Sequence, residues 1–311
     1  LGGSAPPSKL SSWALEEARA RTSRLSDETS LQVLAAEIGN FRVALSLESQ
    51  GELEPRAGLK LATMLAQYWL TTSAPEGRNW LETMLDRYPE PTDEFEDLML
   101  FANAHNRLGA LAYQHQDWVV ASAAYAKARS FAERAGNIAL TVSTRLNEGL
   151  VLAEQGHLSL AKPILIESEE YFRLEGLTPQ WLLTLINLAR VQVRSGNYEA
   201  AKGLLNQFRE ANAIHQGPAS IVCSVGQATC ALLTGQDPTE FLDEIGEHEA
   251  TLDIHNRALY YQLKGTAAFA RGDSESEAIY DQKVAFLLDE GALVNDFDLR
   301  LKERLRGVGL P

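Results

Sequence analysis

Apolar residues recur at intervals of three and four positions along most of the chain, from Trp13 to about Arg306. This spacing places them on one side of an α-helix, and the alternating runs of β-branched residues expected of strands are nearly absent. Prolines are rare and mostly fall between the helical stretches, as at Pro89 and Pro218. The pattern predicts an all-α chain.

The helical pattern repeats with a period of about 40 residues. Small residues at fixed places would let two antiparallel helices approach closely, and larger apolar residues would fill the space between them. The three clearest copies are Leu108, Gly109, Ala112, Trp118, Ala121, Tyr125 and Ala128, then Gly149, Gly156, Leu158, Ala161, Leu165 and Ser168, then Ala189, Gly196, Tyr198, Ala201, Leu205 and Phe208. Their turns also correspond, with a helix-ending residue, a polar residue and an apolar residue that starts the next helix: Gln116-Asp117-Trp118, Gly156-His157-Leu158 and Gly196-Asn197-Tyr198.

Weaker copies flank these three. One upstream copy runs from Leu61 to Pro89, and two downstream copies start near Ala228 and Gly265, with Asp237-Pro238 altering one turn. We therefore expect about six helix-turn-helix units of roughly 40 residues each.

The predicted organisation is one helical array over residues 8–311. It consists of an N-terminal helix pair in 8–56 (near 8–24 and 28–49), the repeats in 57–290, and a C-terminal cap in 291–311 with a helix near 297–306. The Gly/Ser/Pro-rich stretch 1–7 is expected to be a linker or a cloning remnant, because it lacks the charged and apolar regions of a signal peptide. We interpret the chain as a fragment of a longer protein.

The repeat motif resembles the tetratricopeptide repeat (TPR) family. The run Leu108-Gly109, Ala112, Trp118, Ala121, Tyr125 and Ala128 corresponds to the family motif almost position for position. The departures are a repeat longer than the basic unit of about 34 residues and the altered turn at Asp237-Pro238. The resemblance implies a right-handed superhelix of antiparallel helix pairs, with longer helices and a wider superhelix than the basic unit gives.

A second resemblance covers residues 31–290. The run Leu34–Leu45, then Tyr68-Trp69-Leu70 and Glu76-Gly77-Arg78-Asn79-Trp80-Leu81, is similar to the C-terminal TPR region of bacterial signal-transduction ATPases and LuxR-type transcriptional regulators. The resemblance implies a sensor, in which the array binds an inducer or a partner protein and relieves autoinhibition of an upstream nucleotide-binding switch. The same motifs occur in free-standing TPR proteins. The chain itself contains no Gly-x-x-x-x-Gly-Lys-Ser/Thr loop, so we expect no ATP binding by it.

Charge and cysteine content narrow the possible partners. The chain has 28 Lys and Arg against 42 Asp and Glu, a formal charge of −14, which argues against a nucleic acid partner. No apolar run reaches the roughly 18 residues of a membrane span. The two cysteines, Cys223 and Cys230, fit a reducing compartment, and we expect a cytoplasmic protein. They share a face of an apolar helix, where small buried side chains are the ordinary interpretation.

In a TPR superhelix the first helix of each unit lines a concave groove, and its inward positions recur from unit to unit. Arg107, Asn147 and Asn187 occupy the same position in the three clearest copies and would form a ladder. The amide and guanidinium groups of such residues can bind peptide backbone or carboxylates. The predicted groove residues are Trp69, Asn103, Asn106, Arg107, Tyr113, Asn147, Asn187, Arg190, Arg194, Gln262 and Thr266.

Structural roles compete with these assignments. The asparagines would equally bond the neighbouring unit, Arg190 would equally pair with a glutamate, and Trp80, Trp118 and Trp181 are expected to be packing residues. Glu244 and His248 lie four residues apart, but a metal site would need further ligands. We predict no metal and no cofactor, and no nucleophile–base set is evident.

We therefore interpret the chain as a non-catalytic binding module, the sensor region of a larger bacterial regulator, that holds a peptide, protein or small-molecule inducer in its groove. A free-standing scaffold for protein–protein interaction is the alternative, and an enzyme with a site in the groove is a further one. The identity of the ligand, the oligomeric state and whether the terminal helix fills the groove stay open.

Overall fold

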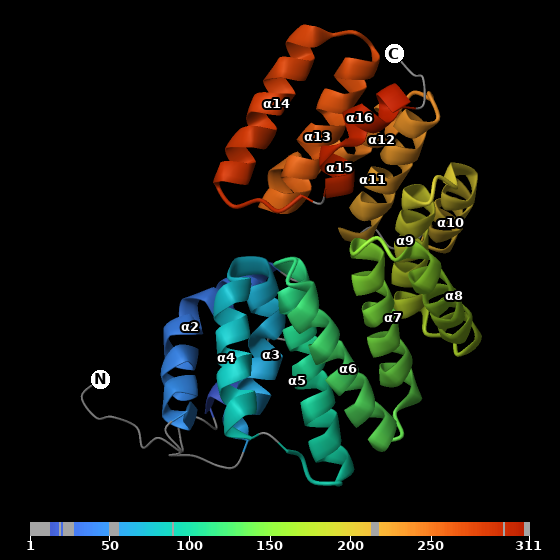
Figure 1. Ribbon diagram of the computed structural model, residues 1–311. Coiled ribbons are helices and arrows are strands. Elements are labelled where there is room, and N and C mark those ends of the chain that lie inside the picture. Colours follow the sequence, from blue (N-terminus) through green and yellow to red (C-terminus); the bar gives the residue numbers. More distant parts are fainter. Residues whose placement is uncertain are drawn as a thin grey trace. The chain divides into compact units, whose positions relative to one another are not determined.

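The protein is described here by a computed structural model, which is helical throughout the residues that it describes (Figure 1). These residues are 13–18, 20, 28–49, 56–88, 90–212, 218–294 and 296–307. The prediction of an all-α fold is confirmed. Residues 1–7, the proposed linker, lie outside the described ranges. Among the described residues, no helix combines the length and the apolar character needed to cross a membrane.

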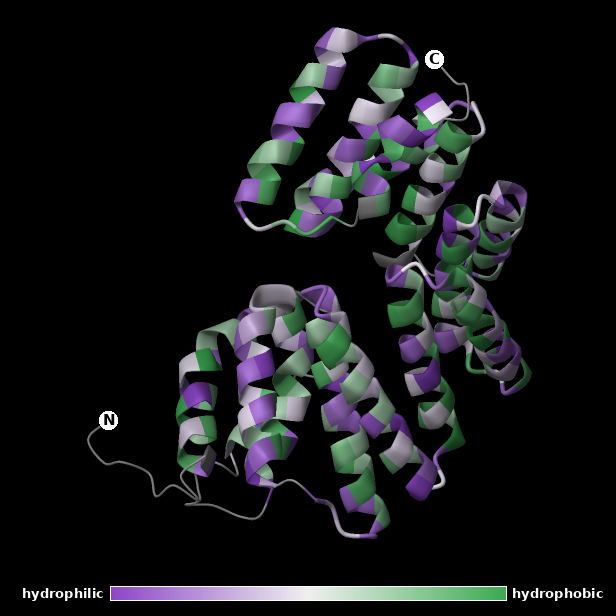
Figure 2. Ribbon diagram, in the orientation of Figure 1, coloured by the Kyte–Doolittle hydropathy of each residue, from purple (hydrophilic) through white to green (hydrophobic). Residues whose placement is uncertain are grey.

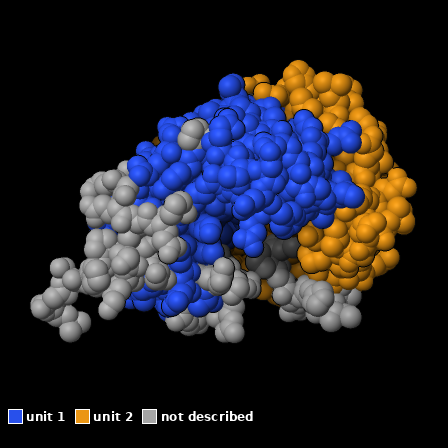
Figure 3. All heavy atoms as spheres, turned by 90° about the horizontal axis from the view of Figure 1, so that it is seen from below, with its two compact units in different colours: residues 1–151 blue, residues 152–311 orange. Residues whose placement is uncertain are grey.

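The chain divides into two compact units, residues 1–151 and 152–311 (Figure 3). The helices that begin in unit 1 are α2 (Glu28–Ser49), α3 (Ala57–Thr72), α4 (Ala74–Arg87), α5 (Phe95–Gln114), α6 (Trp118–Arg134) and α7 (Ile138–Glu154), whose last residues belong to unit 2. The helices of unit 2 are α8 (Leu158–Leu174), α9 (Thr178–Arg194), α10 (Tyr198–Ala211), α11 (Pro218–Leu233), α12 (Thr239–Gly246), the 3₁₀ turn η1 (Glu249–Thr251), α13 (Ile254–Ala270), α14 (Ser274–Asp289), α15 (Asp296–Leu299) and α16 (Leu301–Gly307).

Within each unit, consecutive helices form antiparallel pairs, such as α3 with α4, α5 with α6, and α13 with α14 (Figure 1). Their starts follow the predicted repeat, and the altered turn at Pro238 leads into the short helix α12. The prediction of helix-turn-helix units is therefore confirmed. A single continuous array over residues 8–311 stays a prediction.

Small residues bring the two helices of a pair close together, as the repeat motif predicts. A Cβ atom added to Gly109 of α5 would lie 2.6 Å from Cε1 of Tyr125 on α6. At Gly77 of α4 the same addition would lie 2.5 Å from Cβ of Trp69 on α3. Both separations are too short for a carbon–carbon contact, so glycine is required at each position.

The turns between helices have the geometry that their sequences predict. Gly156 and Gly196 have φ angles of 83° and 78°, in the left-handed region that ends a helix at low cost for glycine. At the first of the three turns Gln116 takes this conformation instead, with φ 58°. Asp117 follows it and caps α6, since its Oδ1 accepts a hydrogen bond of 3.2 Å from the N–H of Val120.

Each unit has its own apolar core, and Figure 2 shows the apolar residues on helix faces that meet neighbouring helices. In unit 1 the core includes the fully buried Phe41, Trp69 and Phe101. In unit 2 it includes the C-terminal helix α16, because Leu301 and Leu305 are completely buried in the same cluster as α11 and α13. The predicted C-terminal helix near 297–306 is therefore present as α15 and α16.

Candidate functional site

A pocket of about 340 Å³ opens between α3 and α5 in unit 1, which we call the α3–α5 pocket. Its size falls in the range typical of sites for small ligands or single side chains. It is lined by Lys60, Thr63, Met64 and Gln67 of α3 and by Leu100, Asn103 and Arg107 of α5. These positions are spaced by three or four residues on each helix, so they form two parallel stripes facing one space.

The lining residues of the two helices correspond at a separation of 40 residues. Lys60 corresponds to Leu100, Thr63 to Asn103, and Gln67 to Arg107. First helices of successive units therefore do present equivalent positions on one surface. Asn103 and Arg107 were predicted to share such a surface, and the structure brings them together in this pocket.

Arg107 is the charged centre of the α3–α5 pocket. Its Nη1 donates a hydrogen bond of 3.3 Å to Oε1 of Gln67, which is its one hydrogen bond with the described residues. No carboxylate among the described residues pairs with it. Burial lowers the pKa of the Arg107 guanidinium, because partial removal from water disfavours the charged form. The guanidinium is thus held in a half-buried position with most of its donors unused.

The other polar groups of the pocket are also incompletely used. Asn103 donates from Nδ2 to the carbonyl oxygen of Met99 at 2.8 Å, one turn earlier in α5, and no hydrogen bond to its Oδ1 occurs within the described residues. Lys60 is exposed, and its ammonium group makes no ion pair with any described residue. The pocket therefore combines two cations and two amides with no acidic side chain.

Asn106 and Asn147 bind each other rather than standing free. Nδ2 of Asn147 donates a hydrogen bond of 2.9 Å to Oδ1 of Asn106, joining α7 to α5. This is the inter-unit bond that competes with a ligand role for an asparagine on a first helix. Tyr113 lies half-buried at the end of α5, with its ring edge-on to Trp118 at a centroid distance of 5.3 Å. These residues stabilise the α5–α7 surface, and their contact with a ligand stays a prediction.

Arg190 and Arg194 have an internal acidic partner in unit 2. Glu154 accepts hydrogen bonds from both, at 2.9 Å from Nη2 of Arg190 and 2.6 Å from Nη2 of Arg194. The carboxylate is 9% exposed, so the arginines neutralise a nearly buried negative charge. Arg194 also donates to the carbonyl oxygen of Ala153 at 3.1 Å. Their charges are therefore used within the fold, unlike that of Arg107.

Asn187, the third member of the predicted ladder, lies half-buried on α9 in unit 2. Its side chain makes no hydrogen bond with the described residues. Because Arg107 and Asn147 belong to unit 1, a continuous row of the three residues stays a prediction.

The placement of Trp69 on the groove surface is wrong. Its side chain is 0% exposed and packs against Gly77, in the core between α3 and α4. The error comes from the register. Trp69 was aligned with Tyr113, 44 residues later, whereas the first helices correspond at 40 residues and Gly109 is the true counterpart. The connection from α3 to α4 is the single residue Ser73, so the second helices are offset differently from the first.

Gln262 and Thr266 are also not available to a ligand in a groove. Gln262 is 6% exposed and Thr266 is 0% exposed. The C-terminal segment covers them: Nε2 of Gln262 donates a hydrogen bond of 3.3 Å to the carbonyl oxygen of Leu299 in α15. Arg194 of α9 lies over the ring of Phe297 at 5.9 Å, so the same segment also reaches α9. Within unit 2 the first-helix surface is occupied by the chain's own C-terminus.

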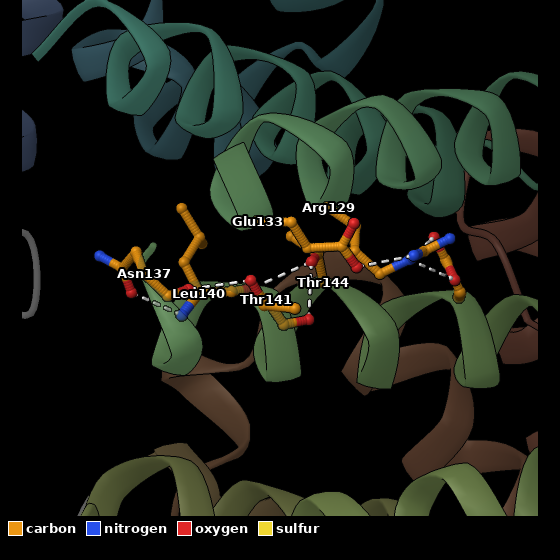
Figure 4. A network of polar contacts seen from close by, with 7 residues as sticks. Arg129, Glu133, Asn137, Leu140, Thr141 and Thr144 are labelled. Atoms are coloured by element: carbon orange, nitrogen blue, oxygen red, sulfur yellow. Dashed lines mark hydrogen bonds and ion pairs between the residues drawn. The ribbon is translucent and has the colours of Figure 1, made fainter. Parts of the chain in front are cut away.

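Polar networks elsewhere in unit 1 satisfy themselves, as on α6 and α7 (Figure 4). Arg129 binds Glu133 on its own helix at 2.9 Å and Glu148 on α7 at 3.0 Å. At the start of α7, Oδ1 of Asn137 accepts a hydrogen bond of 2.9 Å from the N–H of Leu140. The pairing accounts for these groups, which stabilise the α6–α7 pair.

The remaining candidates have structural roles. Both cysteines are buried, and burial raises the pKa of Cys223 to about 12 and that of Cys230 to about 11, so neither thiol is activated. Glu244 accepts a hydrogen bond of 2.9 Å from Arg209, and Nδ1 of His255 accepts one from the N–H of Leu293. Among the described residues, no three His, Cys, Asp or Glu side chains lie close enough together to hold a metal ion.

Three solved structures resemble the chain. The apo form of RapI has a TM-score of 0.65 at 14% identity, covering 90% of this chain and 99% of RapI. Aspartyl phosphate phosphatase F from Bacillus subtilis has a TM-score of 0.63 at 14% identity, covering 92% of this chain and 72% of the phosphatase. The Rap conjugation gene regulator of plasmid pLS20, in complex with the Phr* peptide, has a TM-score of 0.59 at 13% identity, covering 97% of this chain and 95% of the regulator.

The protein has a TPR-type fold. At these identities the likeness establishes the fold alone. No family model matches the chain, and no curated protein matches it.

Sequence reasoning missed five of the seven residues that line the α3–α5 pocket. They are Lys60, Thr63, Met64, Gln67 and Leu100. A shift of 40 residues from Asn103 and Arg107 would have found Thr63 and Gln67. The register of 44 taken from the turns concealed them.

Proposed function

We propose that the chain is a non-catalytic TPR-type module that binds a peptide or a segment of a partner protein. The observation that carries the proposal is the α3–α5 pocket, where Gln67, Asn103 and Arg107 offer amide and guanidinium groups that the fold leaves largely unused. Amides suit peptide backbone, because each carries both a donor and an acceptor. The complex of the pLS20 Rap regulator with its Phr* peptide supports peptide binding by a protein of this fold.

The binding surface in this proposal lies on the first helices of unit 1, chiefly α3 and α5. The first helices of unit 2 are covered by α15 and α16, and Arg190 and Arg194 are held by Glu154. Polar groups that must be paired within the fold contribute to stability, whereas groups left unpaired at a pocket are available to a ligand.

We further propose that the module is the sensor region of a larger bacterial regulator in the cytoplasm. The resemblance of Leu34–Leu45 and Glu76–Leu81 to the TPR regions of signal-transduction ATPases supports this context. A ligand would act by preferring one conformation of the array, which would shift an upstream nucleotide-binding switch. A free-standing scaffold that grips partner proteins is the alternative, and catalysis is the least supported.

Selection from a randomised peptide library displayed against the whole chain tests the binding function. We expect a single motif to be enriched, and Asn103→Ala with Gln67→Ala to reduce its affinity about tenfold or more, which is about 1.4 kcal/mol. Glu133→Ala on α6 is the matched control and should leave the affinity unchanged. Equal affinity of all three chains for the selected peptide would contradict the assignment to the α3–α5 surface.

The sensor context has a separate test in the coding sequence upstream of Leu1. A phosphate-binding loop and a DNA-binding segment encoded there would support the regulator, and an initiator Met directly before Leu1 would contradict it. This result bears on the context alone, because a free-standing scaffold would still bind peptides.

A further inference from the structure

We propose that the α3–α5 pocket is a carboxylate-binding subsite, in which Arg107 forms a bidentate pair with a carboxylate of the bound ligand. The inference rests on the proposed peptide-binding function and names the chemical group that this part of the surface selects. Neither the fold nor the structural neighbours assign it.

The pairing of the arginines supports the assignment of Arg107. Arg129 binds Glu133 and Glu148, and both Arg190 and Arg194 bind Glu154. Arg107 is more than half withdrawn from water and binds only the neutral amide of Gln67 among the described residues. A guanidinium in such a place is solvated poorly, and a carboxylate restores the lost interaction through two parallel hydrogen bonds.

The other lining residues favour an anionic ligand and do not compete with it. Lys60 lies at the same pocket and adds a second positive charge, whereas none of the lining residues is acidic. Gln67 and Asn103 flank the guanidinium with amide groups that can donate to the second lone pairs of a carboxylate. The local charge is thus opposite to the −14 of the whole chain.

The apolar part of the pocket favours a carboxylate attached to an amino acid over inorganic phosphate. Met64 and Leu100 line the same space, and its volume of about 340 Å³ is large enough for a side chain beside the charged group. Phosphate would be expected where several arginines or backbone N–H groups converge. Here one guanidinium and one ammonium group meet an apolar wall.

Two sources could supply the carboxylate: the C-terminus of a peptide, or an Asp or Glu side chain within it. Three small probes distinguish them. N-acetylleucine carries a terminal carboxylate beside an apolar side chain, N-acetylglutamic acid α-amide carries only a side-chain carboxylate, and N-acetylleucinamide carries no charge. Each is titrated into the whole chain at constant ionic strength, up to about 20 mM, a concentration that detects the weak binding expected of single residues.

We expect the amide shifts of Asn103 and Arg107 to saturate with one or both carboxylates, at an affinity about tenfold higher than that for N-acetylleucinamide. Tighter binding of N-acetylleucine assigns the pocket to a chain terminus, and tighter binding of the glutamate probe assigns it to an acidic side chain. Equal affinity for acid and amide, or no saturation by either acid, would overturn the proposal. Tighter binding of inorganic phosphate than of both acids would also overturn it.

Variants separate the charge from the fold. Arg107→Gln should remove the preference for the acid, and Arg107→Lys should keep part of it, because lysine offers a point charge without the bidentate fork. Arg87→Gln removes the same charge from the exposed end of α4 and should leave the preference intact. Peptide binding that persists in Arg107→Gln without a preference for acids would support the subsite; loss of the peptide surface itself is tested separately by the Asn103 and Gln67 variants.

Discussion

Asn147 of α7 donates a hydrogen bond of 2.9 Å from its Nδ2 to Oδ1 of Asn106 on α5. The two side chains are half-buried and join the first helices of two successive helix pairs. A pair of neutral amides at this position accounts for asparagine at both sites without a ligand.

We predict that Asn106 and Asn147 are coupled in stability. Asn106→Ala and Asn147→Ala should each lower the free energy of unfolding by about 1 kcal/mol, and the double variant should cost less than their sum. Denaturant unfolding of the four chains measures this coupling. Strict additivity of the two changes would show that the hydrogen bond contributes nothing to the fold.

Replacing Arg107 and Arg194 should have opposite effects on stability. Arg107→Met removes a half-buried charge that has no acidic partner among the described residues, and we expect the free energy of unfolding to rise by about 1 kcal/mol in buffer without carboxylates. Arg194→Met leaves the nearly buried Glu154 with one arginine fewer and should lower it by about 2 kcal/mol.

Thermal unfolding of both methionine variants against the unchanged chain provides the measurement. The result that contradicts the interpretation is a loss of stability in Arg107→Met as large as that in Arg194→Met. That result would give Arg107 a structural role equal to that of the paired arginine.

The close approach of α5 and α6 depends on Gly109. Gly109→Ala places a methyl group 2.6 Å from the ring of Tyr125, and we expect a loss of about 2 kcal/mol in the free energy of unfolding. Gly203→Ala on α10 is the matched control. No atom lies within 4 Å of its added Cβ, so the higher helix propensity of alanine should stabilise the chain by up to about 1 kcal/mol. Equal effects at both glycines would contradict the packing role.

His105 should make unit 1 sensitive to acid. It is 7% exposed, and burial together with the charge of Lys127 lowers its pKa to about 4. Its unfolded pKa is about 6.5. The unfolded chain therefore binds the proton first, so stability is complete above pH 6.5 and is lost as the pH falls from 6.5 to 4.

The expected loss from this histidine is about 2 kcal/mol between pH 7.5 and pH 5. Urea midpoints at the two pH values measure it, and His105→Leu should reduce the difference by that amount. An unchanged pH dependence in the leucine variant would assign the acid sensitivity to other groups.

The repeat predicted the fold well because its determinants are local. Glycine in a left-handed turn, as at Gly156 and Gly196, and a small residue opposite a large one, as at Gly109 and Tyr125, depend on residues within one helix pair. These features can be recognised from spacing alone.

The site was predicted less well because it depends on contacts between helix pairs. The pairing of Arg194 with Glu154 spans 40 residues, and nothing in the spacing distinguishes it from the unpaired Arg107. The burial of Gln262 depends on where the C-terminal segment packs, 37 residues later in the chain. Trp69 was misplaced by a one-residue connection at Ser73, which shifts the two helices of its pair by different amounts.

The left-handed glycines at the helix ends divide the middle of the chain into equal lengths. Gly136, Gly156, Gly176 and Gly196 follow one another at intervals of 20 residues, so each interval contains one helix and one turn. A segment cut from one of these glycines to the second one after it begins and ends in the same backbone conformation and contains one complete helix pair. The chain can accordingly be shortened or lengthened at these positions by whole pairs, whereas removal of a single helix would reverse the direction of every helix that follows.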